Sequence, residues 1–253
     1  MLIEPFLCRK DNIAVLLHDE VSRKTIAIDA SDGTAILEKL DKMGWLLDIV
    51  FITHHHADHT EGIHILKEKT GSLLIGPEDE KEKIPGLDRT VRDGETINTG
   101  FCLVQAIEMP GHTLGSMTYY IPQEKHIFTG DTLFSLGCGR PFEGSAAMLF
   151  SSLQKFNKIP DDTQVYCGHE YTVSNGYFAL MVDPHNQVLQ KRMANVIALR
   201  QCGKLALPST MSLERMTNPF LRSADPKIRI NLNLINASDE SVFAELRERK
   251  DNF

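Results

Sequence analysis

A histidine-rich segment directly follows the apolar run Asp48–Ile52, and it restricts what this chain can fold into more than any other feature. Within seven residues it holds four imidazoles and one carboxylate, in the order Thr53, His54, His55, His56, Ala57, Asp58 and His59. A strand that ends in such a loop directs these side chains into one small volume. Neutral imidazole and carboxylate groups are suitable ligands for zinc, iron or manganese. Because His54 and His56 project together from the loop, while the later two ligands point differently as a helix begins, the spacing favours two metal ions.

Three later residues have the same setting, since each follows a strand-like run and a glycine: they are His112, Asp131 and His169. Glycine lets the backbone turn sharply and approach a neighbouring segment closely. Several strand ends that deliver side chains to one edge of a rigid scaffold build a site there. One such residue would be weak support, but the three together with the histidine-rich segment predict a metal centre.

The composition is that of an ordinary globular protein, since 42% of the 253 residues are apolar and 24% are charged. This length is sufficient for one large domain, or for a main domain with an appendage. No apolar run approaches the roughly 20 residues that a membrane span needs, and the N-terminus lacks the features of a signal peptide. We therefore predict a cytoplasmic protein with no membrane partner. The net charge of −7 argues against nucleic acid as a partner.

The cysteines predict the same compartment. There are five of them, an odd number, and no two have C-x-x-C spacing. We interpret them as reduced, mostly buried thiols rather than as a disulfide framework; they are Cys8, Cys102, Cys138, Cys167 and Cys202. Cys138 and Cys167 lie near predicted site residues, but structural packing is the simpler role for both.

The pattern of apolar residues divides the chain into two parts. Up to about Tyr166 the segments are short and strand-like and lack the spacing of alternating strands and helices, which favours two packed sheets with flanking helices. From about Tyr171 onward helical patterns prevail. We therefore predict an α+β fold, with a β-rich catalytic domain over residues 1–172 and a smaller helical domain over residues 173–253.

Individual elements follow from the same patterns. The expected strands are Ile13–Leu17, Thr25–Ile28, Asp48–Ile52, Leu73–Ile75, Phe101–Met109, Thr118–Ile121, His126–Phe128 and Gln164–Tyr166. The expected helices are Gly33–Lys42, Thr60–Lys69, Ser174–Met181, Asn186–Cys202 and Asp239–Lys250. Ser238 or Asp239 is a suitable N-terminal cap for the last helix, whose apolar stripe contains Val242, Phe243 and Leu246.

The order of the potential ligands resembles that of the metallo-β-lactamase superfamily, whose members have an αββα sandwich with a metal site at one edge. Within this superfamily the chain is most similar to the glyoxalase II family of hydroxyacylglutathione hydrolases, over nearly its whole length. The metal motif indicates only the superfamily, whereas the C-terminal part and its basic tail point to the family. The similar segments are Gly130–Phe134, Gly137–Arg140, Phe142–Gly144, Gly168–Thr172, Asn218–Arg222 and Arg247–Phe253.

The resemblance implies ligands for two divalent ions, with zinc expected first and iron or manganese as alternatives. The first ion would be held by His54, His56 and His112, and the second by Asp58, His59 and His169. Asp131 would bridge the two ions together with a water or hydroxide. Asp29, at the end of its strand, resembles a carboxylate that orients a ligand, and a turn or helix-cap aspartate is the alternative.

For the reaction, the resemblance implies hydrolysis of S-D-lactoylglutathione and other 2-hydroxyacyl-glutathiones, the second step of methylglyoxal detoxification. The products would be D-lactate or another 2-hydroxy acid, and glutathione. The metal-bridging hydroxide would attack the thioester carbonyl, since metal ions lower the pKa of water to about 7 and stabilise the developing charge. Asp58 and Asp131 would be the catalytic residues, with Asp58 accepting a hydrogen bond from the hydroxide.

The resemblance also implies where the carboxylates of glutathione bind. Arg247 and Lys250 lie three residues apart on an expected helix and would share a face, a spacing that by itself favours a solvated helix face. Together with Arg140 and Tyr171 they match the glutathione contacts of the family. Phe142 is a departure, because many eukaryotic relatives have a tyrosine here. One hydrogen bond to the substrate would then be missing or made by water.

Several alternatives exist. A mononuclear iron persulfide dioxygenase shares the loop motif but normally lacks the helical C-terminal part. A β-lactamase would need an export signal, a nuclease a basic face, and a flavodiiron oxidoreductase a flavin domain. A non-catalytic module that binds metal or glutathione conjugates is a different class, although it would be expected to have lost ligands.

We expect a monomer, and we assign surface or structural roles to the other histidines, which are His18, His55, His64, His126 and His185.

Overall fold

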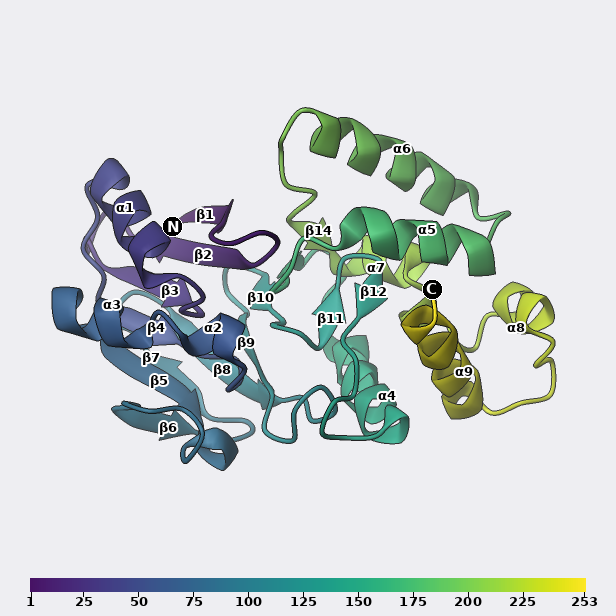
Figure 1. The fold of residues 1–253 in the computed structure, drawn as a ribbon, viewed down its shortest axis with the longest axis horizontal. Coiled ribbons are helices and arrows are strands. Elements are labelled where there is room, and N and C mark those ends of the chain that lie inside the picture. The colour runs from purple at the N-terminus through teal and green to yellow at the C-terminus, as the bar shows by residue number, and fades with distance from the viewer.

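Two six-stranded sheets that pack face to face form the centre of the computed structural model, which describes residues 1–253 (Figure 1). In the first sheet the strands β1 to β6 lie side by side in chain order. They span Leu2–Leu7, Ile13–His18, Thr25–Ile28, Ile49–Phe51, Leu73–Pro77 and Arg89–Val91. The pairs from β1 to β3 are antiparallel, and those from β3 to β6 are parallel.

The second sheet has the spatial order β14-β13-β10-β9-β8-β7. In that order its strands span Ser209–Thr210, Gln164–Tyr166, His126–Phe128, Met117–Ile121, Leu103–Glu108 and Thr96–Asn98. Here β10 and β13 are parallel, while β9 is antiparallel to both β8 and β10. A small separate hairpin, β11 (Leu133–Phe134) with β12 (Gly137–Cys138), lies between this sheet and the later helices.

An apolar core fills the space between the two sheets. Phe51 of the first sheet and Tyr119 and Phe128 of the second are at most 1% exposed, and the rings of Phe51 and Tyr119 are 4.7 Å apart. The hydroxyl of Tyr119 donates to the carbonyl of Ile52 at 2.7 Å, so its polar end is satisfied inside the core. This contact holds the end of β4 where the histidine-rich segment begins.

Helices cover the outer face of each sheet. Helices α1 (Gly33–Met43) and α3 (Ile63–Thr70) pack on the first sheet through Ile36, Leu40 and Leu66. Helix α4 (Ala146–Lys155) and the C-terminal helices share one core with the second sheet. The architecture confirms the predicted αββα sandwich with helices at its C-terminal end.

The chain after β13 is mainly helical. Its helices are α5 (Thr172–Val182), α6 (Gln187–Gln201), α7 (Met211–Thr217), α8 (Pro226–Leu232) and α9 (Asp239–Asp251). Ser238 is the cap of α9, since its hydroxyl accepts from the amide of Ser241. The predicted division at residue 172 coincides with the start of α5. However, β14 from the later part pairs with β13, so one sheet contains residues from both sides of the division.

One expected helix is interrupted. Instead of a single helix over Thr60–Lys69, the chain forms the short α2 (Ala57–Thr60) and then α3. The break falls at Gly62, whose amide donates to the carbonyl of Ala30 at 2.7 Å. A Cβ atom on Gly62 would lie 2.6 Å from that same oxygen. The close packing of Gly62 against the start of α1 therefore interrupts the expected helix.

Several elements escaped prediction because they are short or lack a clear period. Strands β6, β7, β11, β12 and β14 have only two or three residues each. Strand β1 contains Pro5, which suits its position at the edge of the sheet. Helix α4 was also not expected, although Ser145 caps it by accepting from the amide of Met148.

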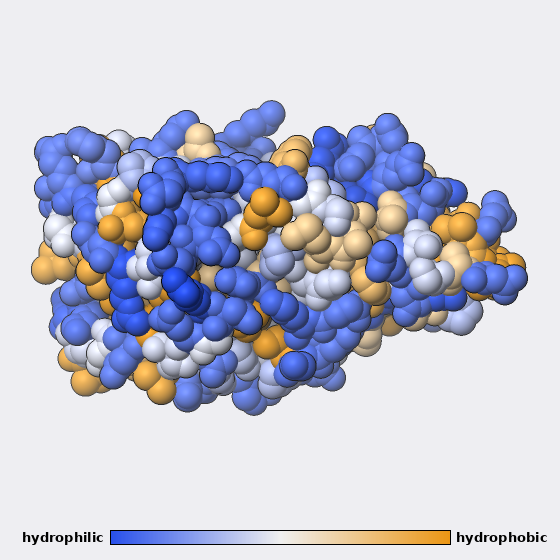
Figure 2. Space-filling view, turned by 90° about the horizontal axis from the view of Figure 1, so that it is seen from below, coloured by the Kyte–Doolittle hydropathy of each residue, from blue (hydrophilic) through white to orange (hydrophobic).

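The surface agrees with a globular chain. On the face shown in Figure 2, hydrophilic residues prevail, and apolar residues form patches among them. None of the helices combines the length and the apolar character that crossing a membrane requires.

Candidate metal centre and substrate pocket

Strand direction explains why residues far apart in sequence meet at one edge of the sandwich. Parallel strands β3 and β4 end at the same edge, where they lead into Asp29 and His54. Parallel strands β10 and β13 likewise lead into Asp131 and His169. Strand β8 runs in the same direction as β10, because both are antiparallel to β9, and it leads into His112.

Three imidazoles converge at this edge to form what we call the first ligand group, His54, His56 and His112. His56 Nδ1 lies 3.1 Å from His54 Nε2 and 3.0 Å from His112 Nε2. The other ring nitrogens of two of these residues are held by the protein. His54 Nδ1 is 3.0 Å from the hydroxyl of Thr53, and His112 Nδ1 donates to the carbonyl of Arg140 at 2.8 Å. These contacts leave the converging nitrogens free to bind a cation.

A second ligand group consists of Asp58, His59 and His169. The Nε2 atoms of His59 and His169 are 3.2 Å apart, and Asp58 Oδ2 lies 3.3 Å from His169 Nε2. The outer ring nitrogens of the two histidines are again held by the protein, in this group by carboxylates. His59 Nδ1 is 2.8 Å from Asp29 Oδ2, and His169 Nδ1 is 3.0 Å from Asp11 Oδ1.

Asp131 lies between the two groups. Its Oδ2 is 3.5 Å from His112 Nε2 and 3.3 Å from His169 Nε2. Its Oδ1 is buried and makes no hydrogen bond, and the nearest cationic group is His59, whose Nε2 lies 3.4 Å away. The close approach of the backbone explains one nearby glycine, since a Cβ atom on Gly168 would lie 2.4 Å from Asp131 Oδ1.

The donor set fits divalent metal ions. Ligand nitrogens about 2.0–2.1 Å from a zinc ion in tetrahedral geometry lie about 3.3 Å from each other, close to the separations within both groups. A buried carboxylate oxygen without a partner also needs a cation or a donor. The residues therefore fit one cation in each group, with Asp131 in reach of both.

The electrostatics of the two groups differ. Burial lowers the pKa of His54 well below its usual range, and burial together with His112 lowers the pKa of His56 to about 4. Burial alone would also lower the pKa of His169, but the carboxylates of Asp131 and Asp58 raise it to about 10. Asp131 and Asp29 likewise raise the pKa of buried His59 well above its usual range. The second group thus attracts positive charge strongly, whereas the first offers neutral nitrogens.

The loop between β1 and β2 contributes residues that the sequence did not reveal. Asn12 Nδ2 donates to Asp58 Oδ2 at 3.0 Å, and Asp11 accepts from His169. Asp29 was expected to orient a ligand, and it lies against His59 as described. No periodic or motif signal marks Asp11 and Asn12, because their role arises only when the β1–β2 loop meets the loop after β13.

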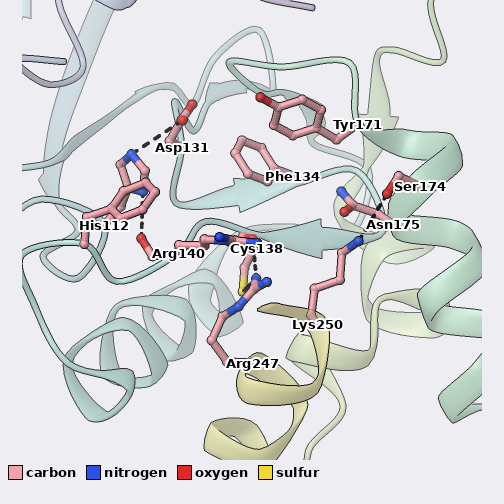
Figure 3. A pocket seen from close by; sticks show the side chains of 11 residues that line it. His112, Asp131, Phe134, Cys138, Arg140, Tyr171, Ser174, Asn175, Arg247 and Lys250 are labelled. Atoms are coloured by element: carbon pink, nitrogen blue, oxygen red, sulfur yellow. Dashed lines mark hydrogen bonds and ion pairs between the residues drawn. The ribbon is translucent and has the colours of Figure 1, made fainter. Parts of the chain in front are cut away.

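A cavity of about 330 Å³ opens beside the metal centre (Figure 3). His112 and Asp131 lie at one end, and Arg247 and Lys250 reach it from α9 at the other. The remaining lining residues are Phe134, Cys138, Arg140, Phe142, Tyr171, Ser174 and Asn175. Phe134, Cys138, Ser174 and Asn175 were not predicted as pocket residues, since side chains of these types have no distinctive pattern in the sequence.

The cationic residues of the cavity have different surroundings. Arg247 is only 5% exposed and donates to the carbonyl of Cys138 at 2.8 Å, so it is not on a solvated helix face. Lys250 donates to the hydroxyl of Ser174 at 3.2 Å. The carboxylate of Asp251 lies 3.0 Å from Arg140 Nε and 2.8 Å from Arg247 Nη2, which brings these two guanidinium groups together.

Two aromatic residues lie next to the metal ligands. The ring of Tyr171 stacks on that of His169 with centroids 4.7 Å apart. Phe142 is 65% exposed, and its ring centroid lies 5.3 Å from that of His112. An exposed apolar side chain at this position forms one wall of the cavity entrance beside the first ligand group.

Comparison with known proteins agrees with this geometry. A model of the metallo-beta-lactamase superfamily matches residues 20–169, and a model described as the hydroxyacylglutathione hydrolase C-terminus matches residues 170–253. Among solved structures, ETHE1 from Myxococcus xanthus is 25% identical with a TM-score of 0.68, and the match covers 99% of this chain and 98% of that one. A metallo-beta-lactamase from Staphylococcus aureus is 20% identical with the same TM-score of 0.68, over 99% of this chain and 71% of that one. Fold and site thus define a member of the metallo-β-lactamase superfamily with a His/Asp cluster suited to divalent metal.

More similar relatives specify the family. Hydroxyacylglutathione hydrolases of Brucella anthropi and Brucella ovis are each 54% identical over 251 residues, which is 99% of this chain and 96% and 98% of theirs. The chain belongs to the hydroxyacylglutathione hydrolase (glyoxalase II) family.

Proposed function

We propose that this enzyme hydrolyses S-D-lactoylglutathione and other 2-hydroxyacyl-glutathiones to D-lactate (or another 2-hydroxy acid) and glutathione, as in the detoxification of methylglyoxal. One observation supports this proposal above all. A single cavity joins His112 and Asp131 to the cationic side chains Arg247 and Lys250. A substrate with a reactive carbonyl at one end and carboxylates at the other matches this arrangement.

We further propose that two divalent ions, with zinc expected first, bind to the two ligand groups. His54, His56 and His112 would hold one ion, Asp58, His59 and His169 the other, and Asp131 would contact both. Bound ions of this kind lower the pKa of water to about 7 and polarise the carbonyl. Zinc, iron and manganese all accept such ligands.

The protein's own residues have defined tasks in this proposal. Asn12 donates to Asp58 Oδ2, which orients this carboxylate to accept a hydrogen bond from the attacking water. Asp11 and Asp29 fix the ring orientation of His169 and His59. The leaving group needs no dedicated acid, because a thiol with a pKa of about 8.5 leaves readily as thiolate.

Substrate recognition would come from the helical part. Arg247, Lys250 and Arg140 would bind the carboxylates of glutathione, and Tyr171 would contact its backbone. Phe142 offers no hydroxyl, so that hydrogen bond would be missing or made by water. We accordingly propose residues 1–172 as the catalytic domain, residues 173–253 as the substrate-binding domain, and a monomer as the active form.

The test is steady-state hydrolysis of S-D-lactoylglutathione, with metal content measured on the same sample. Efficient turnover with about two ions per chain is expected, together with loss of turnover in Asp131→Ala but not in the exposed control Asp41→Asn. No turnover by protein that is replete with metal would reject the substrate. In that case, oxygen consumption with a persulfide and about one iron per chain would support a dioxygenase instead.

A further inference from the structure

His55, the one histidine of the metal loop outside both ligand groups, points toward two carboxylates. Its Nδ1 lies 3.1 Å from Glu80 Oε2, and its Nε2 lies 3.4 Å from Glu143 Oε1. The side chain of Glu80 is 1% exposed. Neither His55 Nδ1 nor Glu80 Oε2 has a hydrogen-bond partner. A buried charged oxygen without a partner is costly. His55 Nδ1 is the polar atom within reach of Glu80 Oε2, so the two atoms form a buried pair.

The same two carboxylates also hold the loop that contains His112. Glu80 Oε1 accepts from the hydroxyl of Thr113, and from the amide of Gly115 at 3.2 Å. Glu143 Oε2 accepts from the amide of Leu114 at 2.9 Å. The two acids therefore connect the His54–His56 segment to the segment that directly follows His112. The first segment contains His54 and His56, and the second is directly attached to His112, so together they fix the backbone beside all three members of the first ligand group.

A third cation site is a weaker explanation for this cluster. His55 presents a different ring nitrogen to each carboxylate, whereas one metal ion binds only one nitrogen of an imidazole. In addition, the ammonium group of Lys83 lies 2.8 Å from Glu143 Oε1 and already supplies positive charge there.

We propose that His55, Glu80 and Glu143 form a clamp that positions the first ligand group for its metal ion. This proposal depends on the metal centre of the proposed function but not on the proposed substrate. The residues of the clamp belong to neither ligand group and do not line the cavity, so they act as positioning residues. Altering outer residues that orient metal ligands typically changes metal affinity about 10–100-fold.

The experiment uses the full chain with zinc and a competing chelator. His55→Asn cannot reach both carboxylates, and Glu80→Gln removes the charge that faces His55 while it keeps an acceptor for Thr113. The matched controls are His64→Asn and Glu68→Gln, whose side chains are 92% and 57% exposed on α3. We expect both test variants to bind one of the two zinc ions about tenfold or more weakly, and both controls to match the wild type.

Two further readouts separate positioning from a general folding defect. Anomalous diffraction at the zinc edge should locate the retained ion at the second ligand group. The metal-free variants should keep the wild-type circular dichroism spectrum and a cooperative unfolding transition, although the loss of a buried contact lowers their melting temperature. Retention of both ions at wild-type affinity would overturn the clamp, as would equal weakening of both sites. Because zinc affinity is measured without substrate, failure of thioester hydrolysis would leave this test intact.

Discussion

Asp29 shows how one residue links the fold to the site. It has a left-handed backbone conformation with φ of 61°, which is uncommon for any residue but glycine. Its carboxylate accepts from the amide of Thr53 at 2.8 Å and from the hydroxyl of the same residue, and it contacts His59 at 2.8 Å. One side chain thus holds the start of the histidine-rich segment and one of its ligands.

Replacement of Asp29 by asparagine should therefore impair the second ligand group. The amide keeps the size of the side chain but removes the charge that faces His59 Nδ1. We expect zinc affinity at the second group to fall about 10–100-fold, with a smaller change at the first group. Chelator competition measures both, and Asp41→Asn on the exposed side of α1 is the control. Unchanged zinc affinity would show that Asp29 only holds the backbone at Thr53 and does not orient His59 for metal binding.

Lys250 allows a test of substrate recognition with little risk to folding, because it is only partly buried, unlike Arg247. Loss of a charge-assisted contact to a carboxylate is worth about 1.5–3 kcal/mol, or roughly tenfold or more in affinity. Lys250→Ala should therefore raise KM for S-D-lactoylglutathione at least about tenfold and leave kcat nearly unchanged. Lys191→Ala on exposed α6 is the control. A fall in kcat with unchanged KM would contradict a role in binding.

At the scale of elements, helix α9 has two tasks. Phe243 and Leu246 face the core that α9 shares with α4 and the second sheet, and Phe243 packs 5.6 Å from the ring of Phe150. Arg247 and Lys250, one turn further on, face the cavity. The position of both cations is therefore set by the packing of the preceding turns.

Truncation of Phe243 tests this coupling. Removal of a fully buried phenylalanine costs about 3–5 kcal/mol of unfolding free energy, so Phe243→Ala should lower the urea midpoint markedly. KM should also rise, since the end of α9 loses its support. Phe253→Ala, which removes a side chain that is 58% exposed, should change stability far less. Equal losses of unfolding free energy in the two variants would contradict this account of α9.

At the scale of the whole molecule, metal ions and protons compete for the same site. Without metal, burial opposes charge on His169, but Asp131 and Asp58 raise its pKa to about 10, and the pKa of His59 is raised as well. The His169 ring is therefore protonated on both nitrogens at neutral pH, and a metal ion must displace one of these protons. His56, with its pKa lowered to about 4 chiefly by burial, is already neutral.

Metal binding at pH 7 should therefore release about one proton per chain from His169. Affinity at the second group should rise as pH increases toward about 10, roughly tenfold per pH unit for each proton displaced. The first group should show little dependence above pH 6. Calorimetry of zinc binding in buffers of different ionisation enthalpy measures the proton count. Binding without proton release would contradict this assignment.

Prediction from sequence succeeded where a pattern is local and repeated. The strands before His54, Asp131 and His169 each have an apolar run followed by a ligand type, and strand direction places their ends at one edge. Strands β6 (Arg-Thr-Val) and β14 (Ser-Thr) were missed, because they lack the apolar run that marks the equally short β10 and β13 and pair only when the sheet already exists. The break at Gly62 failed for a similar reason, since its cause is the backbone of Ala30 far away in sequence.

The sequence alone thus indicated the potential ligands, the division of the histidine-rich segment into two pairs, and the β-rich and helix-rich parts, because residue type and spacing are local properties. The assignment of the remaining ligands to two ions came from the family resemblance. Only the tertiary structure decided that Arg247 is buried against Cys138, that Asp11 and Asn12 support the second group, and that His55 faces Glu80 and Glu143. Each of these contacts joins residues more than 20 positions apart, and such pairs are chosen by how strands and helices pack rather than by any signal within one segment.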